Sequence, residues 1–194
     1  AIMGKSGEGK STLLHILGTL ERPCLGELEI LNKPVTAARS ILLRRHQIGF
    51  IFQAHNLLED FSVLENILMP AQIARLPISI TSASYRIALD FLERVGLKQR
   101  ADFPAKLLSG GEKQRVAIAR AFCNDPSLIL ADEPSGNLDR NNSRTIHQLL
   151  IQAAKDNGKT LIVATHDQEL ANLCDRLLIL KEGNVKEGEH RCRF

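Results

Sequence analysis

The sequence predicts an α/β fold in which a parallel sheet is covered by helices on both faces. Short, continuously apolar segments, such as Ser127–Ala131 and Thr160–Ala164, have the composition of strands that are buried on both sides. Segments between them show the helical spacing of apolar residues, as in Asp139–Asn157. Strands that alternate with helices form parallel sheets, and ligands bind beyond the carboxyl ends of such strands.

The first part of the chain is predicted to alternate between strands and helices. A helix from Lys10 to about Leu20 carries apolar residues that we expect to face inward, namely Leu13, Leu14, Ile16, Leu17 and Leu20. The other elements expected here are the end of a strand at Ala1–Met3, a strand at Gly26–Leu31, a short basic helix at Ala37–His46 and an apolar strand at Ile48–Phe52.

The middle of the chain has a different character, because no segment of it resembles a strand. Two helices are predicted, Val63–Ala74 and Tyr85–Val95, separated by Pro77 and a stretch rich in serine and threonine. We therefore expect one domain with an α/β core at 1–53 and 107–194 and an inserted helical subdomain at 54–106.

The last part returns to the alternation of helices and strands. A helix at Gly110–Cys123 is stopped by Asn124, Asp125 and Pro126, and the helix at Asp139–Asn157 is closed by Gly158. The apolar face of the second helix consists of Ile146, Leu149, Leu150 and Ala153. We expect Arg176–Leu180 to be the last strand.

Composition excludes several classes of function. The net charge of +3 comes from 25 basic and 22 acidic residues spread along the chain, without a dense basic stripe. Nucleic acid is therefore not expected as a partner. The four cysteines (Cys24, Cys123, Cys174 and Cys192) lack the spacing of a zinc site or a disulfide framework. No apolar run is long enough to span a bilayer, so a membrane role requires a partner protein.

A phosphate-binding loop begins almost at the first residue. The residues Gly4, Lys5, Ser6, Gly7, Glu8, Gly9, Lys10, Ser11 and Thr12 match the Walker A pattern. Its glycines let successive backbone N–H groups turn toward one anion, and the helix that follows adds its positive end. Lys10 is predicted to reach the β- and γ-phosphates of a nucleotide, and Ser11 to hold Mg²⁺.

A second motif supplies the acids that phosphoryl transfer requires. The strand Leu128–Ala131 is followed by Asp132, which we expect to hold Mg²⁺, and by Glu133, placed to polarise the attacking water. Two acids after a strand are often only a solvated loop, but the Walker A pattern favours the catalytic interpretation.

A second helix start with the features of an anion site follows at Leu108–Arg115. Ser109 is a good N-cap, and Gly110 and Gly111 leave backbone N–H groups open. An ordinary capped helix is the alternative. One triphosphate does not need two such sites in one chain. We therefore expect this second helix start to serve a nucleotide that is held by the Walker A loop of another copy.

These eight residues match completely the signature LSGGxxQR of the ABC transporter ATPase family, which the whole chain resembles. The resemblance implies a RecA-like P-loop NTPase core, hydrolysis of ATP with Mg²⁺, and a homodimer in which Ser109, Gly110, Gly111 and Gln114 act on the partner's nucleotide. It also implies that Gln53 binds nucleotide and metal, that Ser135–Asp139 lies along the dimer interface, and that His166 is catalytic together with Glu133 and Lys10.

Within that family, Phe50–Leu58, Ser62–Ile67 and Glu133–Asp139 are most similar to the lipoprotein-releasing and macrolide-exporter ATPases. This implies a peripheral subunit on the cytoplasmic face of the inner membrane that energises integral-membrane permease subunits for lipoprotein release, without touching the cargo. The alternatives are a drug or peptide exporter ATPase and a nucleotide-gated scaffold of a cell-division complex. ABC proteins that act on DNA or ribosomes fit less well, because Lys10 and Asp132 lie in one compact domain and only one cassette is present.

One part of the family pattern has no counterpart in the sequence. The family stacks adenine on an aromatic residue upstream of Walker A, in a region of antiparallel strands, and both are missing here. We therefore expect the chain to be part of a longer protein.

Overall fold

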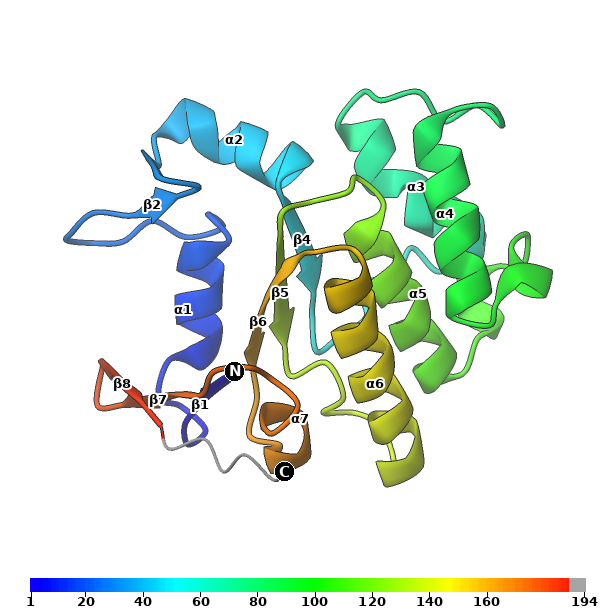
Figure 1. The fold of residues 1–194 in the computed structure, drawn as a ribbon. Helices are drawn as coiled ribbons and strands as arrows, with labels where there is room; N and C mark the ends of the chain where they lie inside the picture. The colour runs from blue at the N-terminus through cyan, green and yellow to red at the C-terminus, as the bar shows by residue number, and fades with distance from the viewer. Residues whose placement is uncertain (189–194) are drawn as a thin grey trace.

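A computed structural model describes residues 1–188 of the chain, and strands alternate with helices along it (Figure 1). The strands are β1 (Ile2–Met3), β2 (Glu29–Ile30), β3 (Lys33–Pro34), β4 (Ile48–Ile51), β5 (Leu128–Asp132), β6 (Thr160–Ala164), β7 (Leu178–Lys181) and β8 (Asn184–Glu187). The α-helices are α1 (Lys10–Leu17), α2 (Ala37–His46), α3 (Val63–Ile73), α4 (Ala83–Arg94), α5 (Gly110–Phe122), α6 (Arg140–Asp156) and α7 (Gln168–Ala171). Two short 3₁₀ helices cover Lys98–Arg100 and Ala105–Leu107.

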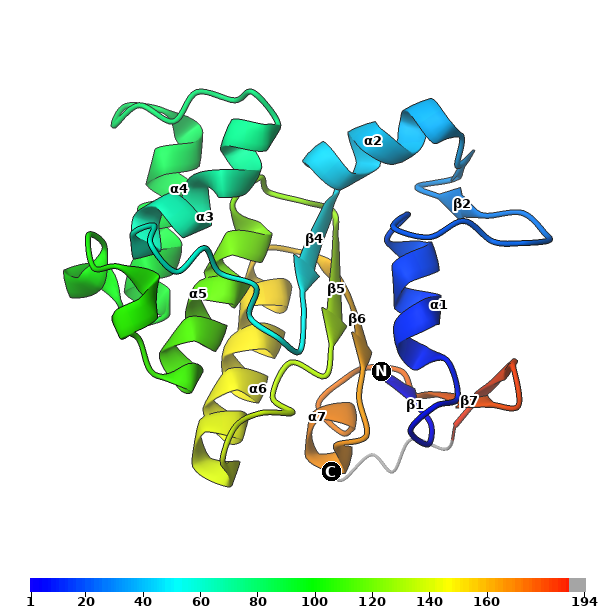
Figure 2. The same cartoon turned by 180° about the vertical axis from the view of Figure 1, so that it is seen from behind.

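Six strands form the main sheet in the order β4-β5-β6-β1-β7-β8. Every neighbouring pair from β4 to β7 is parallel, and only β7 with β8 is antiparallel. The predicted α/β class with a parallel sheet is thus confirmed, with an antiparallel hairpin at one edge. The carboxyl ends of β4, β5 and β6 lie at one end of the molecule, to which the arrowheads point in Figures 1 and 2.

The side chains of the central strands alternate between two cores. Leu130 of β5 and Ala164 of β6 pack with Leu14 of α1. Ile129 of β5 and Val163 of β6 belong to the larger cluster on the opposite face. Helix α1 covers the first face, and α5 and α6 cover the second (Figures 1 and 2). Burial on both faces explains why these strands consist of unbroken apolar residues.

Helices α3 and α4 pack on α5 beside the sheet (Figure 1). Helix α3 begins with a capping box in which the Glu65 backbone N–H donates to Ser62 Oγ and the Ser62 backbone N–H donates to Glu65 Oε2. The ring of Phe91 in α4 stacks on that of Phe122 in α5, with centroids 4.8 Å apart. One continuous apolar cluster joins these helices to the sheet. The division into a core and a subdomain at 54–106 stays a prediction.

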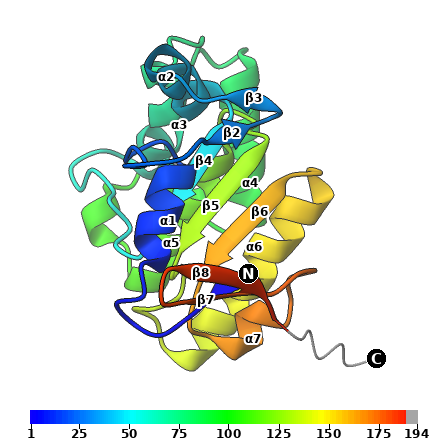
Figure 3. The same ribbon diagram turned by 90° about the vertical axis from the view of Figure 1, so that its left-hand side faces the viewer.

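The prediction that Arg176–Leu180 is the last strand is wrong, because β8 follows it and pairs with β7. All four residues of β8 are exposed, so the strand is defined by backbone pairing and has no apolar pattern. Figure 3 shows this hairpin at the edge of the sheet, and the two residues of its turn, Glu182 and Gly183, both have positive φ angles (50° and 74°).

The region after the first helix also differs from the prediction. Helix α1 ends at Leu17, so Leu20 does not belong to it and is 46% exposed. Gly18 sits against the ring of Phe50 so closely that a Cβ there would lie 2.0 Å from a ring carbon. The expected strand Gly26–Leu31 is reduced to β2, which pairs with β3 in a separate two-stranded sheet.

Three of the cysteines lie in the described part of the chain: Cys24 is exposed, Cys123 buried and Cys174 partly buried. Cys192 lies outside the described residues. Burial raises the pKa of Cys123 to about 12. None of the helices in residues 1–188 combines the length and the apolar character needed to cross a membrane.

Candidate active site

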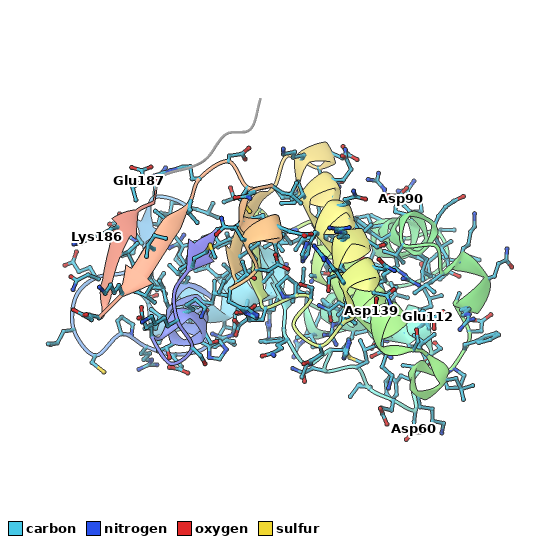
Figure 4. All side chains as sticks on the ribbon, turned by 90° about the horizontal axis from the view of Figure 1, so that it is seen from below. Asp60, Asp90, Glu112, Asp139, Lys186 and Glu187 are labelled. Atoms are coloured by element: carbon cyan, nitrogen blue, oxygen red, sulfur yellow. The ribbon has the colours of Figure 1, made fainter. Side chains whose placement is uncertain are left out.

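A pocket of about 600 Å³ opens beyond the carboxyl ends of the central strands. It is lined by residues of the loop between β1 and α1, by the start of α1 and by three side chains from other loops: Gly4, Lys5, Ser6, Gly7, Gly9, Lys10, Ser11, Thr12, Gln53, Glu133 and His166. The fold thus brings together the Walker A loop and the residues expected to act on the γ-phosphate. Figure 4 views the molecule from this end.

The loop before α1 has the form of an anion cradle. Gly7 and Gly9 have φ angles of 84° and 92°, which side chains rarely adopt, and a Cβ at either position would meet no atom within 4 Å. Gly9 is the N-cap of α1 and no side chain caps the helix, so its first N–H groups are open to a ligand.

Lys10 is folded back over this loop. It is 8% exposed, and its Nζ donates to the carbonyl oxygens of Gly4 (2.9 Å) and Lys5 (3.3 Å). These are the contacts of an ammonium group held at the centre of the cradle, where a phosphate would replace solvent. Ser11 and Thr12, the next two residues of α1, are exposed to the pocket.

Asp132 ends β5, and its Oδ1 is buried with no hydrogen-bond partner among the described residues. A buried carboxylate oxygen without a partner costs free energy unless a ligand satisfies it. A divalent cation with oxygen ligands is the natural occupant of such a position.

Glu133 lies at the wall of the pocket in a network that orients its carboxylate. Its Oε1 is 2.9 Å from Nδ1 of His166, and its Oε2 accepts from Thr165 Oγ1 at 3.2 Å and from the His166 backbone N–H at 3.4 Å. The Glu133 side chain is 14% exposed and that of His166 is 73% exposed. Hydrogen bonds therefore fix the carboxylate of Glu133, and the ring of His166 faces the pocket.

The backbone of Glu133 has a φ angle of 43°, in the left-handed region. A residue other than glycine adopts this conformation only where its surroundings enforce it, at a cost of about 1–3 kcal/mol. Its backbone N–H donates to the Ala164 carbonyl at 2.9 Å, which links β5 to β6 at the site.

Gln53 follows β4 and lies at the mouth of the pocket, with its carbonyl oxygen accepting from Asn137 Nδ2 at 3.2 Å. The residues after it are anchored to α5, because the guanidinium of Arg120 donates to the carbonyl oxygens of His55 (2.7 Å) and Asn56 (2.6 Å). Burial lowers the pKa of His55, whose ring hydrogen-bonds to the backbone of Gly110. The loop after Gln53 is thus tied at two points to α5, the signature helix, which begins directly after Ser109.

The signature residues lie outside this pocket. Ser109 caps α5 in a capping box with Glu112, and the hydrogen bond from the Ser109 backbone N–H holds the pKa of Glu112 below its usual value. Gly110 is exposed, and Gly111 packs on the start of α6. In Figures 1 and 2, the sheet lies between α1 and α5, so the two helix starts of one chain do not face each other.

The structure places Gln114 differently from the other signature residues. It is 1% exposed, and neither atom of its amide has a hydrogen-bond partner among residues 1–188. The side chain faces the interior because it lies one turn into α5, on the face that packs against the core.

Arg120, Thr165 and His147 shape the site and escaped the sequence analysis, which placed Ser135 along the dimer interface without its buried partner His147. One signal could have found His147. It is adjacent to Ile146 and three residues from Leu150 on the apolar face of α6, so a buried polar residue was to be expected there.

Known proteins resemble the chain over most of its length. The family model described as ABC transporter matches residues 1–136. The lipoprotein-releasing system ATP-binding protein LolD of Protochlamydia amoebophila is 53% identical over 174 residues, which are 90% of this chain and 76% of that protein. LolD of Bacteroides fragilis is 46% identical over 188 residues, which are 95% of this chain and 86% of that protein.

Solved structures agree with this assignment. The dimeric structure of MJ0796, a bacterial ABC transporter cassette, has a TM-score of 0.85 at 39% identity and covers 99% of this chain and 85% of that chain. A dimeric post-hydrolysis state of the same cassette bound to ADP and Pi gives a TM-score of 0.84 at 39% identity, with the same coverage of both chains. The P-loop NTPase fold and the family resemblance are thereby confirmed. The chain belongs to the ABC transporter family and is one of its ATP-hydrolysing cassettes.

Proposed function

We propose that the chain is the ATP-hydrolysing subunit of a lipoprotein-releasing ABC transporter, bound to the cytoplasmic face of the inner membrane through integral-membrane permease subunits. The names of its relatives support the choice of lipoprotein release over drug export or a cell-division scaffold. One structural observation carries the enzymatic part: Glu133 and His166 are 2.9 Å apart on the wall of the pocket that the phosphate-binding loop lines.

ATP is bound by the cradle Gly4–Thr12. The open N–H groups of the loop and of the start of α1 hold the β-phosphate, and Lys10 exchanges its two carbonyl contacts for phosphate oxygens. Ser11, Gln53 and Asp132 are the residues that would hold Mg²⁺, which offsets the charge of the phosphates when bound. The partnerless Oδ1 of Asp132 fits that role.

Hydrolysis depends on the carboxylate of Glu133. In the pocket it accepts a hydrogen bond from the attacking water and orients it toward the γ-phosphorus, while Thr165 and the His166 backbone N–H hold its Oε2. His166, whose ring faces the pocket, contacts the γ-phosphate, and Lys10 stabilises the charge that develops on its oxygens.

The signature acts in trans. Because the exposed start of α5 does not reach the pocket of its own chain, Ser109 and Gly110 bind the γ-phosphate held by a second copy. Two ATP molecules are thus enclosed between two cassettes. ATP binding closes the dimer, hydrolysis reopens it, and the motion is passed to the permease, which alone contacts the cargo. Nucleic acid is not a partner.

The experiment that tests this function is reconstitution with the permease subunits in liposomes that carry a triacylated lipoprotein. The wild-type chain is expected to give ATP-dependent release of the lipoprotein, and Glu133→Gln to bind ATP without release. ATP hydrolysis with no release of lipoprotein, but with export of a drug or peptide, would contradict the proposed cargo. Release by Glu133→Gln at the wild-type rate would remove Glu133 from the mechanism.

A further inference from the structure

A buried histidine lies behind the candidate active site without contacting the pocket. His147, in the second turn of α6, is 2% exposed, and its Nε2 is 2.7 Å from Oγ of Ser135, which is also buried. Ser135 is the second residue after Glu133. A short hydrogen bond between two buried side chains fixes the loop that leaves the catalytic acid.

The same nitrogen faces the other loop of the site. Nε2 of His147 is 3.7 Å from Oδ2 of Asp167, the residue that follows His166. The other carboxylate oxygen of Asp167 accepts from the backbone N–H groups of Glu169 and Leu170 and caps α7. Burial lowers the pKa of His147, although Asp167 and Glu169 oppose the shift, so the ring is neutral at neutral pH.

The two loops that meet at His147 are the ones that build the catalytic pair. The Thr165 hydroxyl donates to Glu133 Oε2 and accepts from the Asp167 backbone N–H, at 3.2 Å and 3.0 Å. On the other loop, the Gly136 backbone N–H donates to the Glu133 carbonyl at 3.0 Å. With φ at 43°, Glu133 keeps its backbone conformation only while these neighbours hold it.

We propose that His147 is a positioning residue for ATP hydrolysis, which fixes the loop of Glu133 and the loop of His166 relative to each other through Ser135 and Asp167. Nε2 of His147 shares a hydrogen bond with Ser135 Oγ, and the nearby Asp167 carboxylate favours the tautomer that carries its proton on Nε2. The inference rests on the proposed roles of Glu133 and His166, and it adds a residue of α6 to the determinants of catalytic geometry.

The test compares substitutions at His147 in the full chain. His147→Phe fills the same space without a hydrogen bond, whereas His147→Gln can place an amide N–H near the position of Nε2. We expect His147→Phe to lower kcat for ATP about tenfold to hundredfold, since small displacements of a catalytic group have effects of this size. KM and nucleotide affinity should stay within about twofold, and His147→Gln should recover most of kcat.

Leu150→Ala is the matched control for lost stability, because Leu150 is fully buried one turn further along α6. It should destabilise the fold and leave kcat per folded molecule unchanged. Wild-type kcat in His147→Phe, or an equal loss of kcat in Leu150→Ala, would overturn the proposal. If His147→Phe does not fold, Ser135→Ala removes the same bond from the loop, and wild-type kcat in that variant overturns the proposal equally.

Glu133→Gln distinguishes a failure of the positioning role of His147 from a failure of the proposed catalytic role of Glu133. If this variant is inactive while His147→Phe is fully active, only the positioning role fails. If Glu133→Gln hydrolyses ATP at the wild-type rate, the proposed catalytic role of Glu133 fails with it.

Discussion

Replacement of Arg120 by methionine tests how the loop after Gln53 is held on the signature helix. Arg120 links α5 to this loop, and its two donated bonds end on the carbonyl oxygens of His55 and Asn56. Methionine retains most of the apolar stem and removes the guanidinium. The Asn56 backbone, at a φ angle of 49°, loses one of its supports at the same time.

The expected loss in the free energy of unfolding of Arg120→Met follows from the surroundings of its two hydrogen bonds. A hydrogen bond from a charged donor contributes about 1.5–3 kcal/mol. The bond to His55 is partly buried and counts in full, whereas Asn56 is exposed and its carbonyl regains water. Burial lowers the pKa of Arg120, which means that its charge is itself costly to bury, and methionine relieves that cost. We therefore expect a loss of about 2 kcal/mol in the free energy of unfolding.

Urea unfolding of Arg120→Met, Arg120→Lys and Arg86→Met provides the assay. Lysine cannot donate to both carbonyls with a fixed fork and should lie between wild type and methionine. Arg86 is exposed on α4, so its substitution should change the free energy by less than about 0.5 kcal/mol. The reasoning is refuted if Arg120→Met unfolds at the same urea concentration as Arg86→Met.

Three further predictions concern packing, protonation and nucleotide binding. Gly49→Ala should cost about 3 kcal/mol or prevent folding, because its Cβ would lie 2.1 Å from the Ala121 carbonyl oxygen; thermal unfolding at wild-type temperature would contradict this. Because burial lowers the pKa of His147 below the ordinary imidazole value of 6.5, its contribution to stability is complete above pH 6.5 and falls as the pH drops below that toward the folded-state pKa. Urea titrations at several pH values should show this loss in wild type and less of it in His147→Phe, and equal slopes would contradict it. Lys10→Met should weaken binding of a fluorescent ATP analogue at least tenfold, since the cradle encloses its ammonium group, and an unchanged affinity would rule out this role.

The sequence predicted those parts of the site that are encoded by adjacent residues. The phosphate-binding loop is continuous from Gly4 to Thr12, and Asp132 and Glu133 directly follow an apolar strand, so each pattern is visible within a few residues. The contacts that support these residues cannot be seen in this way, because they join residues far apart in the sequence. Ser135 meets His147 across 12 positions, and Arg120 reaches His55 across 65. Only packing of the helices on the sheet creates such contacts.

In the fold, too, elements defined by a local apolar pattern were predictable, and elements defined by distant contacts were not. Strands β5 and β6 were predictable because both of their faces are buried and their residues are apolar. Strand β8 is exposed throughout, and backbone pairing with β7 alone defines it. Helix α1 ends at Leu17, and the chain turns away at Thr19, which has a φ angle of 59° that no local pattern of apolar residues predicts.

The central claim is that two cassettes enclose ATP between the phosphate-binding loop of one and the signature of the other. Sedimentation velocity of Glu133→Gln with ATP, with ADP and without nucleotide tests it most directly, with the double variant Glu133→Gln, Ser109→Arg as the control that blocks the signature. The account predicts a dimer for Glu133→Gln with ATP alone and a monomer for the double variant. A protein that binds ATP and sediments as a monomer under all three conditions would contradict it.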